Sequence, residues 1–140
     1  HLGRRKFEEL PAFGDDDGVN DQYRGGSEDE YRAGFAAVLA RAAALAGNDP
    51  RRVIVISIPD WGVTPFAEGR DRKQIAREID RFNEINRAES RRAGARYVDV
   101  TTEARGALDV TGDGLHPSAA AYGRWSNLIL SEARDVLELK

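Results

Sequence analysis

The sequence contains no cysteine and no methionine, and its only histidines are His1 and His116. Without cysteine the chain has no disulfide framework, no thiolate zinc site and no cysteine nucleophile. Because His1 occupies the first position, His116 stands alone, and a metal site built from several histidines is not expected. The absence of methionine, including an initiator, leads us to expect either processing or a longer protein whose N-terminal part is missing.

The sequence also lacks a long apolar run and an excess of one charge. Its longest purely apolar stretch, residues 53–56, is far too short to span a bilayer, and no signal-peptide pattern opens the chain. The formal charge of -3, with 32% charged residues of both signs, gives no electrostatic footprint for nucleic acid. We expect a soluble protein with no membrane span and no nucleic-acid partner. The sequence leaves the compartment and the oligomeric state open.

What is present is an alternation of helical and strand patterns, which predicts an α/β domain with a parallel sheet. Residues 53–58 form a β-branched run, typical of a central strand covered on both faces, and residues 95–100 predict a shorter strand. Residues 1–17 differ, because their apolar positions do not alternate and three adjacent aspartates would repel one another in a buried strand. We therefore divide the chain into an irregular segment, 1–17, and one α/β domain, 18–140.

Three helices are predicted from their start and stop signals. A capping box from Ser27 to Glu30 begins the first, and Gly47 ends it. The second closes near Gly94, and the last starts at Pro117 and Ser118. Apolar residues at steps of three and four give each helix a core face. These faces comprise Tyr31, Phe35, Val38, Leu39, Ala42 and Leu45; Ile75, Ile79, Phe82 and Ile85; and Tyr122, Trp125, Leu128, Ile129, Val136 and Leu137.

The residues with the clearest chemistry are Asp113 and His116, which are separated by Gly114 and Leu115 just ahead of the last helix. A glycine-containing loop can turn both side chains toward one point. A carboxylate that holds one ring nitrogen sets the tautomer and leaves the other nitrogen free to take a proton from a hydroxyl. The pair is therefore a candidate general base with its orienting group. The alternative is a turn aspartate beside a half-exposed loop histidine, and spacing alone does not separate the two.

A second motif, the G-x-N-D turn at residues 18–21, gives the pair a family context. This turn, followed by a capped helix and much later by Asp-Gly-x-His-Pro-Ser, resembles the SGNH/GDSL hydrolase family over roughly residues 18–137. The resemblance implies a flavodoxin-like three-layer α/β/α fold and hydrolysis of small-molecule carboxylic esters through an acyl-serine, with no metal or cofactor. It also implies that Asn20 donates to the oxyanion, that His116 is the base and that Asp113 orients it. Taken alone, Asn20 is better explained as an Asx-turn.

The sequence departs from the family where the nucleophile belongs. No strand leads into Gly-Asp-Ser, and the nearest approach, residues 13–16, puts Asp16 in the place of the serine. No other serine has a nucleophile's context, since each is explained by a helix cap, a strand or a helix. We expect either a missing N-terminal portion or a degenerate relative, with the first strands lacking or altered and the chain inactive alone. The alternative is a catalytically dead SGNH-like binding or interaction module.

Two further features bear on ligand binding. Trp61 and Phe66 follow the central strand, at the carboxyl end where open α/β sheets bind ligands, so they either wall a substrate pocket or cover the core. Residues 109–120 also partly match a calcium loop, with oxygen-bearing side chains at its first, third and fifth positions and a glycine at the sixth. Its twelfth position is Ala120, so the bidentate glutamate is lacking and no metal is expected.

Overall fold

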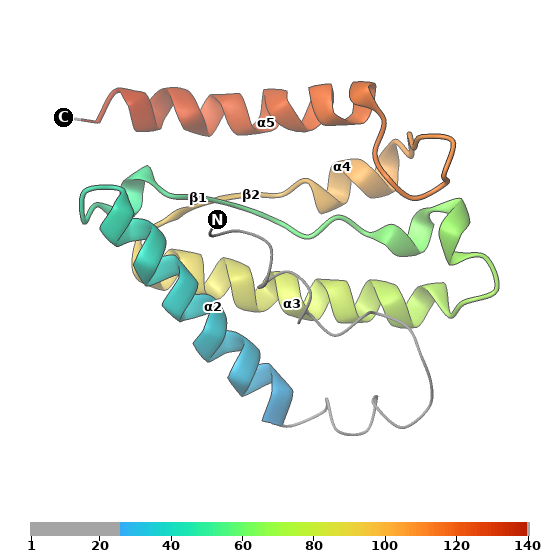
Figure 1. Ribbon diagram of the computed structural model, residues 1–140, viewed down its shortest axis with the longest axis horizontal. Helices are drawn as coiled ribbons and strands as arrows, with labels where there is room; N and C mark the ends of the chain where they lie inside the picture. The colour runs from blue at the N-terminus through green and yellow to red at the C-terminus, as the bar shows by residue number, and fades with distance from the viewer. Residues whose placement is uncertain (1–25, 140) are drawn as a thin grey trace, which may run out of the picture. The chain divides into compact units, whose positions relative to one another are not determined.

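A computed structural model describes residues 26–139 of the chain (Figure 1). The predictions for residues 1–17, for the 18–21 turn with Asn20 and for the capping side chain of Ser27 lie outside the described residues. The chain divides into two compact units, His1–Tyr31 and Arg32–Lys140, and the architecture below belongs to the second. Its elements, with the first helix that enters it, are α2 (Gly26–Leu45), η1 (Pro50–Arg52), β1 (Ile54–Ile56), η2 (Trp61–Val63), η3 (Pro65–Ala67), α3 (Arg72–Ala93), β2 (Arg96–Val98), α4 (Thr101–Gly106) and α5 (Ala119–Leu137).

The sheet consists of β1 and β2, which run parallel with Ile54 opposite Arg96 and Ile56 opposite Val98. One further bond, from Ser57 N to Val98 O at 2.9 Å, extends the ladder past β1. α3 connects the two strands, as a parallel pair requires. Both α3 and α5 pack against the strands, and Figure 1 shows them on opposite sides of the pair. The predicted α/β class with parallel pairing is confirmed.

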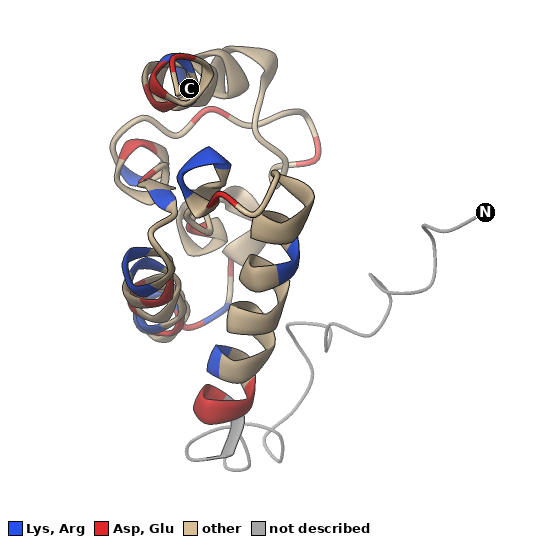
Figure 2. Ribbon diagram, turned by 90° about the vertical axis from the view of Figure 1, so that its left-hand side faces the viewer, with Lys and Arg blue, Asp and Glu red and all other residues tan. Residues whose placement is uncertain are grey.

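α3 is capped at both ends. The Asp71 side chain accepts a hydrogen bond from Gln74 N at the start of α3, and Gly94, in the left-handed region at φ 80°, ends that helix. Ile75 and Ile79 lie on its buried face, where they join Ala67 in a small core. Acidic residues occupy the first turn of α2, where their negative charge interacts favourably with the positive end of the helix dipole (Figure 2). None of the helices within residues 26–139 is long and apolar enough to cross a membrane.

Several predicted boundaries are wrong in detail. β1 covers only three of the six residues in the 53–58 run, and Ile56 is 45% exposed, so this strand is not covered on both faces. Pro117 lies outside α5, because Ser118 is the N-cap and its hydroxyl accepts from Ala121 N. The sequence also gave no sign of α4, a helix of six residues.

Some predicted core positions are also exposed, and for those on α5 the reason is geometric. A helix of 19 residues is about 28 Å long, whereas three strand residues extend about 10 Å. Strands this short cannot cover the whole apolar face of α5. The residues predicted to be core but found exposed are Val38, Leu45, Tyr122, Leu128 and Leu137.

Candidate functional site

The loop between α4 and α5, residues 107–118, folds into a tight turn that carries Asp113 and His116 and is named the His116 turn. An antiparallel bridge joins Val110 to Pro117, and Thr111 N donates to His116 O at 2.8 Å. Gly114 lies between the two functional candidates with a φ of 71°, a backbone conformation that favours glycine. The turn is therefore closed on itself, and the side chains at its ends are held near each other.

Within this turn the Asp113 carboxylate is the centre of a hydrogen-bond network. Its Oδ2 lies 2.5 Å from Nδ1 of His116. Its Oδ1 accepts from the Leu115 and His116 backbone N–H groups, at 2.9 and 3.0 Å, and from the Thr111 hydroxyl at 2.7 Å. The hydrogen bond from His116, followed by those from the backbone and from Thr111, holds the pKa of Asp113 well below its usual range. The carboxylate is therefore ionised at neutral pH and faces donors on both oxygens.

The His116 ring is open to solvent on its other side. Its side chain is 68% exposed, and its only hydrogen-bond partner among residues 26–139 is Asp113, through Nδ1. When Nδ1–H donates to the carboxylate, Nε2 is an unprotonated acceptor on a ring that is largely exposed. This geometry can receive a proton from a hydroxyl brought to Nε2.

A second loop, residues 60–67, carries the two aromatic residues singled out from the sequence and is named the aromatic loop. The rings of Trp61 and Phe66 meet edge to face with centroids 6.2 Å apart, and the Arg70 guanidinium lies 5.6 Å from each. Trp61 packs against the core that includes Ile75, whereas Phe66 is 49% exposed. Trp61 therefore helps to cover the core, and Phe66 presents an apolar ring at the surface.

The two loops are in direct contact. Phe66 N donates to Gly114 O at 3.1 Å, and a Cβ added to Gly114 would lie 3.2 Å from Cβ of Pro65. The structure thus brings Phe66 next to the turn that holds Asp113 and His116. Asn20, the third residue implied by the family resemblance, lies outside the described residues.

A buried ion pair at the start of the aromatic loop was not predicted from the sequence. The Asp60 side chain is 2% exposed and accepts from Gly62 N and from Arg105 Nε, both at 2.8 Å. Arg105 also donates to Asp80 Oδ1 at 2.8 Å. The one local signal was the Asp-x-Gly spacing directly after the strand, because a side chain there can cap the turn that follows. The partner lies 45 positions away and left no sequence pattern.

Four serines of the described chain, Ser57, Ser90, Ser118 and Ser126, make structural hydrogen bonds. Ser57 is buried, and its hydroxyl oxygen accepts from Val100 N at 2.8 Å and lies 2.8 Å from the Thr101 hydroxyl oxygen. Ser118, the serine nearest to His116 in the sequence, caps α5. No serine within residues 28–139 makes a hydrogen bond to His116.

No metal centre is formed by the described part of the chain. Residues 26–139 contain no group of three or more His, Cys, Asp or Glu side chains arranged to hold a metal ion. In the segment that partly matches a calcium loop, Asp113 faces hydrogen-bond donors and Asp109 pairs with Arg124 at 3.5 Å. The carboxylates that a calcium ion would need are thus bonded to protein groups.

Comparison with known proteins supplies the family. Residues 17–124 match the GDSL-like Lipase/Acylhydrolase family, and this range contains the G-x-N-D turn, both loops and the Asp113 and His116 pair. Neither the curated proteins nor the solved structures give a significant match. The matched range is most of the 140-residue chain, so the protein belongs to the GDSL-like lipase/acylhydrolase family of hydrolases.

Proposed function

We propose that this chain carries the general-base half of an ester-hydrolase site. Asp113 holds Nδ1–H of His116, and Nε2 takes the proton of a nucleophilic hydroxyl. The observation that carries the proposal is the 2.5 Å contact between Oδ2 and Nδ1, on an exposed ring with no other hydrogen-bond partner among residues 26–139, in a chain of a hydrolase family. The substrate class that fits this chemistry is a small carboxylic ester.

The proposed reaction follows from these groups. The hydroxyl proton passes to Nε2 of His116 while the oxygen attacks the ester carbonyl, and the imidazolium then protonates the leaving alcohol. Water, deprotonated by His116 in the same way, next attacks the acyl intermediate, and the carboxylic acid leaves as the proton returns to the nucleophilic oxygen. The Asp113 carboxylate stabilises the imidazolium between these steps. By family resemblance, the Asn20 amide donates to the oxyanion. Phe66, with Trp61 packed edge to face behind it, walls the acyl side of the site, and neither a metal nor a cofactor takes part.

The nucleophile is the part that this chain does not supply in recognisable form. It has no Gly-Asp-Ser block, and no described serine bonds to His116. We therefore expect the chain alone to give no turnover of p-nitrophenyl butyrate and no covalent labelling by a fluorophosphonate. Turnover together with a labelled serine would contradict the proposed inactivity.

A gain-of-activity experiment tests the roles directly. A strand and Gly-Asp-Ser segment from an active GDSL relative is joined ahead of residue 18, and hydrolysis of p-nitrophenyl butyrate is measured. We expect activity that His116→Ala abolishes and that Asp113→Asn lowers by about four orders of magnitude, since the ring then presents the wrong tautomer. The matched control is Glu84→Gln on α3, which removes a carboxylate that is 69% exposed and should leave the rate unchanged. Full activity after His116→Ala would refute the assignment of the base.

A further inference from the structure

We propose that α4 is the positioning element of this site, holding the aromatic loop through Arg105 and the His116 turn through Glu103. The inference rests on the proposed function for the meaning of the site, but it is argued from contacts alone. α4 spans Thr101–Gly106 and follows β2 directly. Two of its side chains reach in different directions, one toward each loop.

The first contact fixes the aromatic loop. Arg105 Nε donates to Asp60 Oδ2 at 2.8 Å, and Asp60 Oδ1 in turn accepts from Gly62 N. Because the Asp60 carboxylate is almost completely buried, it depends on Arg105 for its countercharge. Asp60 is the N-cap of η2, which carries Trp61, so the ion pair sets where this loop leaves the sheet. The loop then reaches the His116 turn through the bond from Phe66 N.

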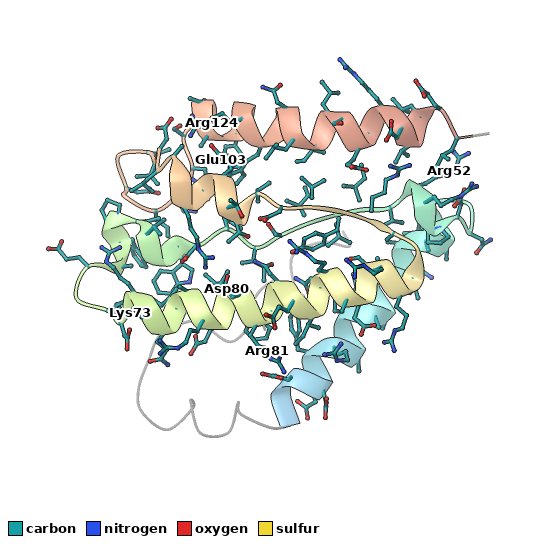
Figure 3. The ribbon with its side chains drawn as sticks, turned by 180° about the vertical axis from the view of Figure 1, so that it is seen from behind. Arg52, Lys73, Asp80, Arg81, Glu103 and Arg124 are labelled. Atoms are coloured by element: carbon teal, nitrogen blue, oxygen red, sulfur yellow. The ribbon has the colours of Figure 1, made fainter. Side chains whose placement is uncertain are left out.

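The second contact fixes the His116 turn. Glu103 accepts hydrogen bonds from Arg124 Nε and, at 2.5 Å, from Trp125 Nε1, both on α5 (Figure 3). Arg124 also donates to Ala107 O at 3.1 Å, at the start of the turn, while α5 itself begins at the end of the turn. Glu103 therefore holds Arg124, and Arg124 joins Ala107, at the start of the turn, to α5, which follows the end of the turn.

α4 is itself fixed to the carboxyl ends of both strands. Thr101 donates its hydroxyl proton to Ile58 O at 2.7 Å, just after β1, and its N–H to Asp99 Oδ1 at 2.9 Å, just after β2. Asp99 also accepts from Thr102 N at 3.1 Å. A short helix bonded in this way to both strands can transmit a fixed position from the sheet to each loop. Both loops are thus held by the same short helix, in addition to their contact with each other.

The test is amide hydrogen exchange and histidine NMR on the full chain. Arg105→Gln should raise the exchange rate of the Phe66 amide about tenfold relative to core amides of α3, because an unpaired buried carboxylate loosens the loop. Glu103→Gln should do the same for the Thr111 amide, which bonds to His116 O. Both variants should shift the ring signals of His116. Arg105→Lys, which keeps the charge, should restore the Phe66 amide in part.

The matched control is Arg96→Gln. Arg96 bonds to Glu132 at 2.8 Å and links β2 to α5, and its side chain is about as buried as that of Arg105. Losing this pair should leave the Phe66 and Thr111 amides and the His116 ring signals unchanged. If the control moves them as much as the α4 variants do, or if folded α4 variants leave them at parent values, the proposal is wrong.

A second variant covers the case in which Arg105→Gln does not fold. The double substitution Asp60→Asn with Arg105→Leu removes both charges, so no buried carboxylate is left unpaired, and the introduced amide oxygen can still accept from Gly62 N. We expect a folded protein with fast exchange at Phe66, and parent-like protection there would overturn the proposal. These readouts require no ester turnover, so failure of the proposed hydrolase function and failure of the positioning role give different results.

Discussion

At the scale of single residues, the Asp113 carboxylate decides which nitrogen of His116 carries the proton. In the parent, Oδ2 accepts from Nδ1, so the neutral ring should be protonated on Nδ1. In Asp113→Asn a carboxamide N–H can donate to Nδ1 instead, and we expect the proton to move to Nε2. Nitrogen-15 chemical shifts of the neutral ring distinguish the two tautomers.

Thr111→Val is the control for this prediction. It removes the hydroxyl that donates to Oδ1 and leaves the Oδ2 contact with His116 in place. The tautomer should therefore stay as in the parent. Identical ring nitrogen shifts in the parent and in Asp113→Asn would show that the carboxylate does not set the tautomer.

Gly114 offers a second test at this scale, because it combines a left-handed backbone with a close neighbour. In Gly114→Ala the backbone of the new residue must keep a φ of 71°, and its Cβ would lie 3.2 Å from Cβ of Pro65. Gly47→Ala has the same strain at φ 77° but meets nothing within 4 Å. We expect Gly47→Ala to lower the free energy of unfolding by about 1 kcal/mol and Gly114→Ala to lower it by more. Urea denaturation measures both losses.

The same pair of variants reports on the contact between the loops. Gly114→Ala should shift the amide signal of Phe66, which bonds to Gly114 O, whereas Gly47→Ala should not. Equal losses of stability in the two variants, with Phe66 unmoved, would mean that Pro65 gives way freely and that the loops are not closely packed.

How much of the site the sequence predicts depends on how local each contact is. Asp113 and His116 are three positions apart in a glycine-containing turn, so their proximity could be inferred from spacing. The Asp60 and Arg105 pair joins positions 45 apart, and neither residue belongs to a motif that names its partner. Such a pair becomes visible only once the strands and α4 are in place.

At the scale of the elements, periodic helices were predictable and short ones were not. α3 combines an apolar residue at every third or fourth position with Gly94 at its end, and the prediction agrees with the structure. α4 has only six residues, less than two turns, so it is too short to show a period. Its position depends on bonds such as that from the Thr101 hydroxyl to Ile58 O, which are tertiary.

The start of α5 can be tested through its cap. Ser118 accepts from Ala121 N at 3.1 Å, and Ser118→Ala should lower the free energy of unfolding by about 1 kcal/mol because this N–H loses its partner. Exchange of the Ala121 amide should accelerate, because its N–H no longer donates to the Ser118 hydroxyl. The control is Ser126→Ala within the same helix, where the hydroxyl only donates to Tyr122 O. If urea denaturation gives the two variants the same stability, the cap contributes nothing.

At the scale of the whole unit Arg32–Lys140, one buried carboxylate ties the first helix to the rest. Glu89 on α3 is 4% exposed and accepts from Arg32 on α2 at 2.8 Å and from Arg92. The hydrogen bond from Arg32 and then that from Arg92 lower the pKa of Glu89, and burial opposes them only in part. A carboxylate whose folded-state pKa is depressed contributes stability above its unfolded-state value, near 4.5, and loses it as the pH falls through the folded-state value.

Acidification should therefore weaken the attachment of α2 to α3. We expect the free energy of unfolding in urea to decline as the pH is lowered from 6 toward 3, and Glu89→Gln to flatten that decline while lowering stability at neutral pH by about 1 to 3 kcal/mol. Glu84→Gln is the matched control, because Glu84 lies on the same helix and pairs with Arg81 at 3.2 Å, but its side chain is 69% exposed. An exposed pair contributes little, so this variant should keep the parent's pH profile. A Glu89→Gln profile as steep as the parent's would mean that other carboxylates account for the acid sensitivity, and that the link from α2 to α3 does not depend on this charge.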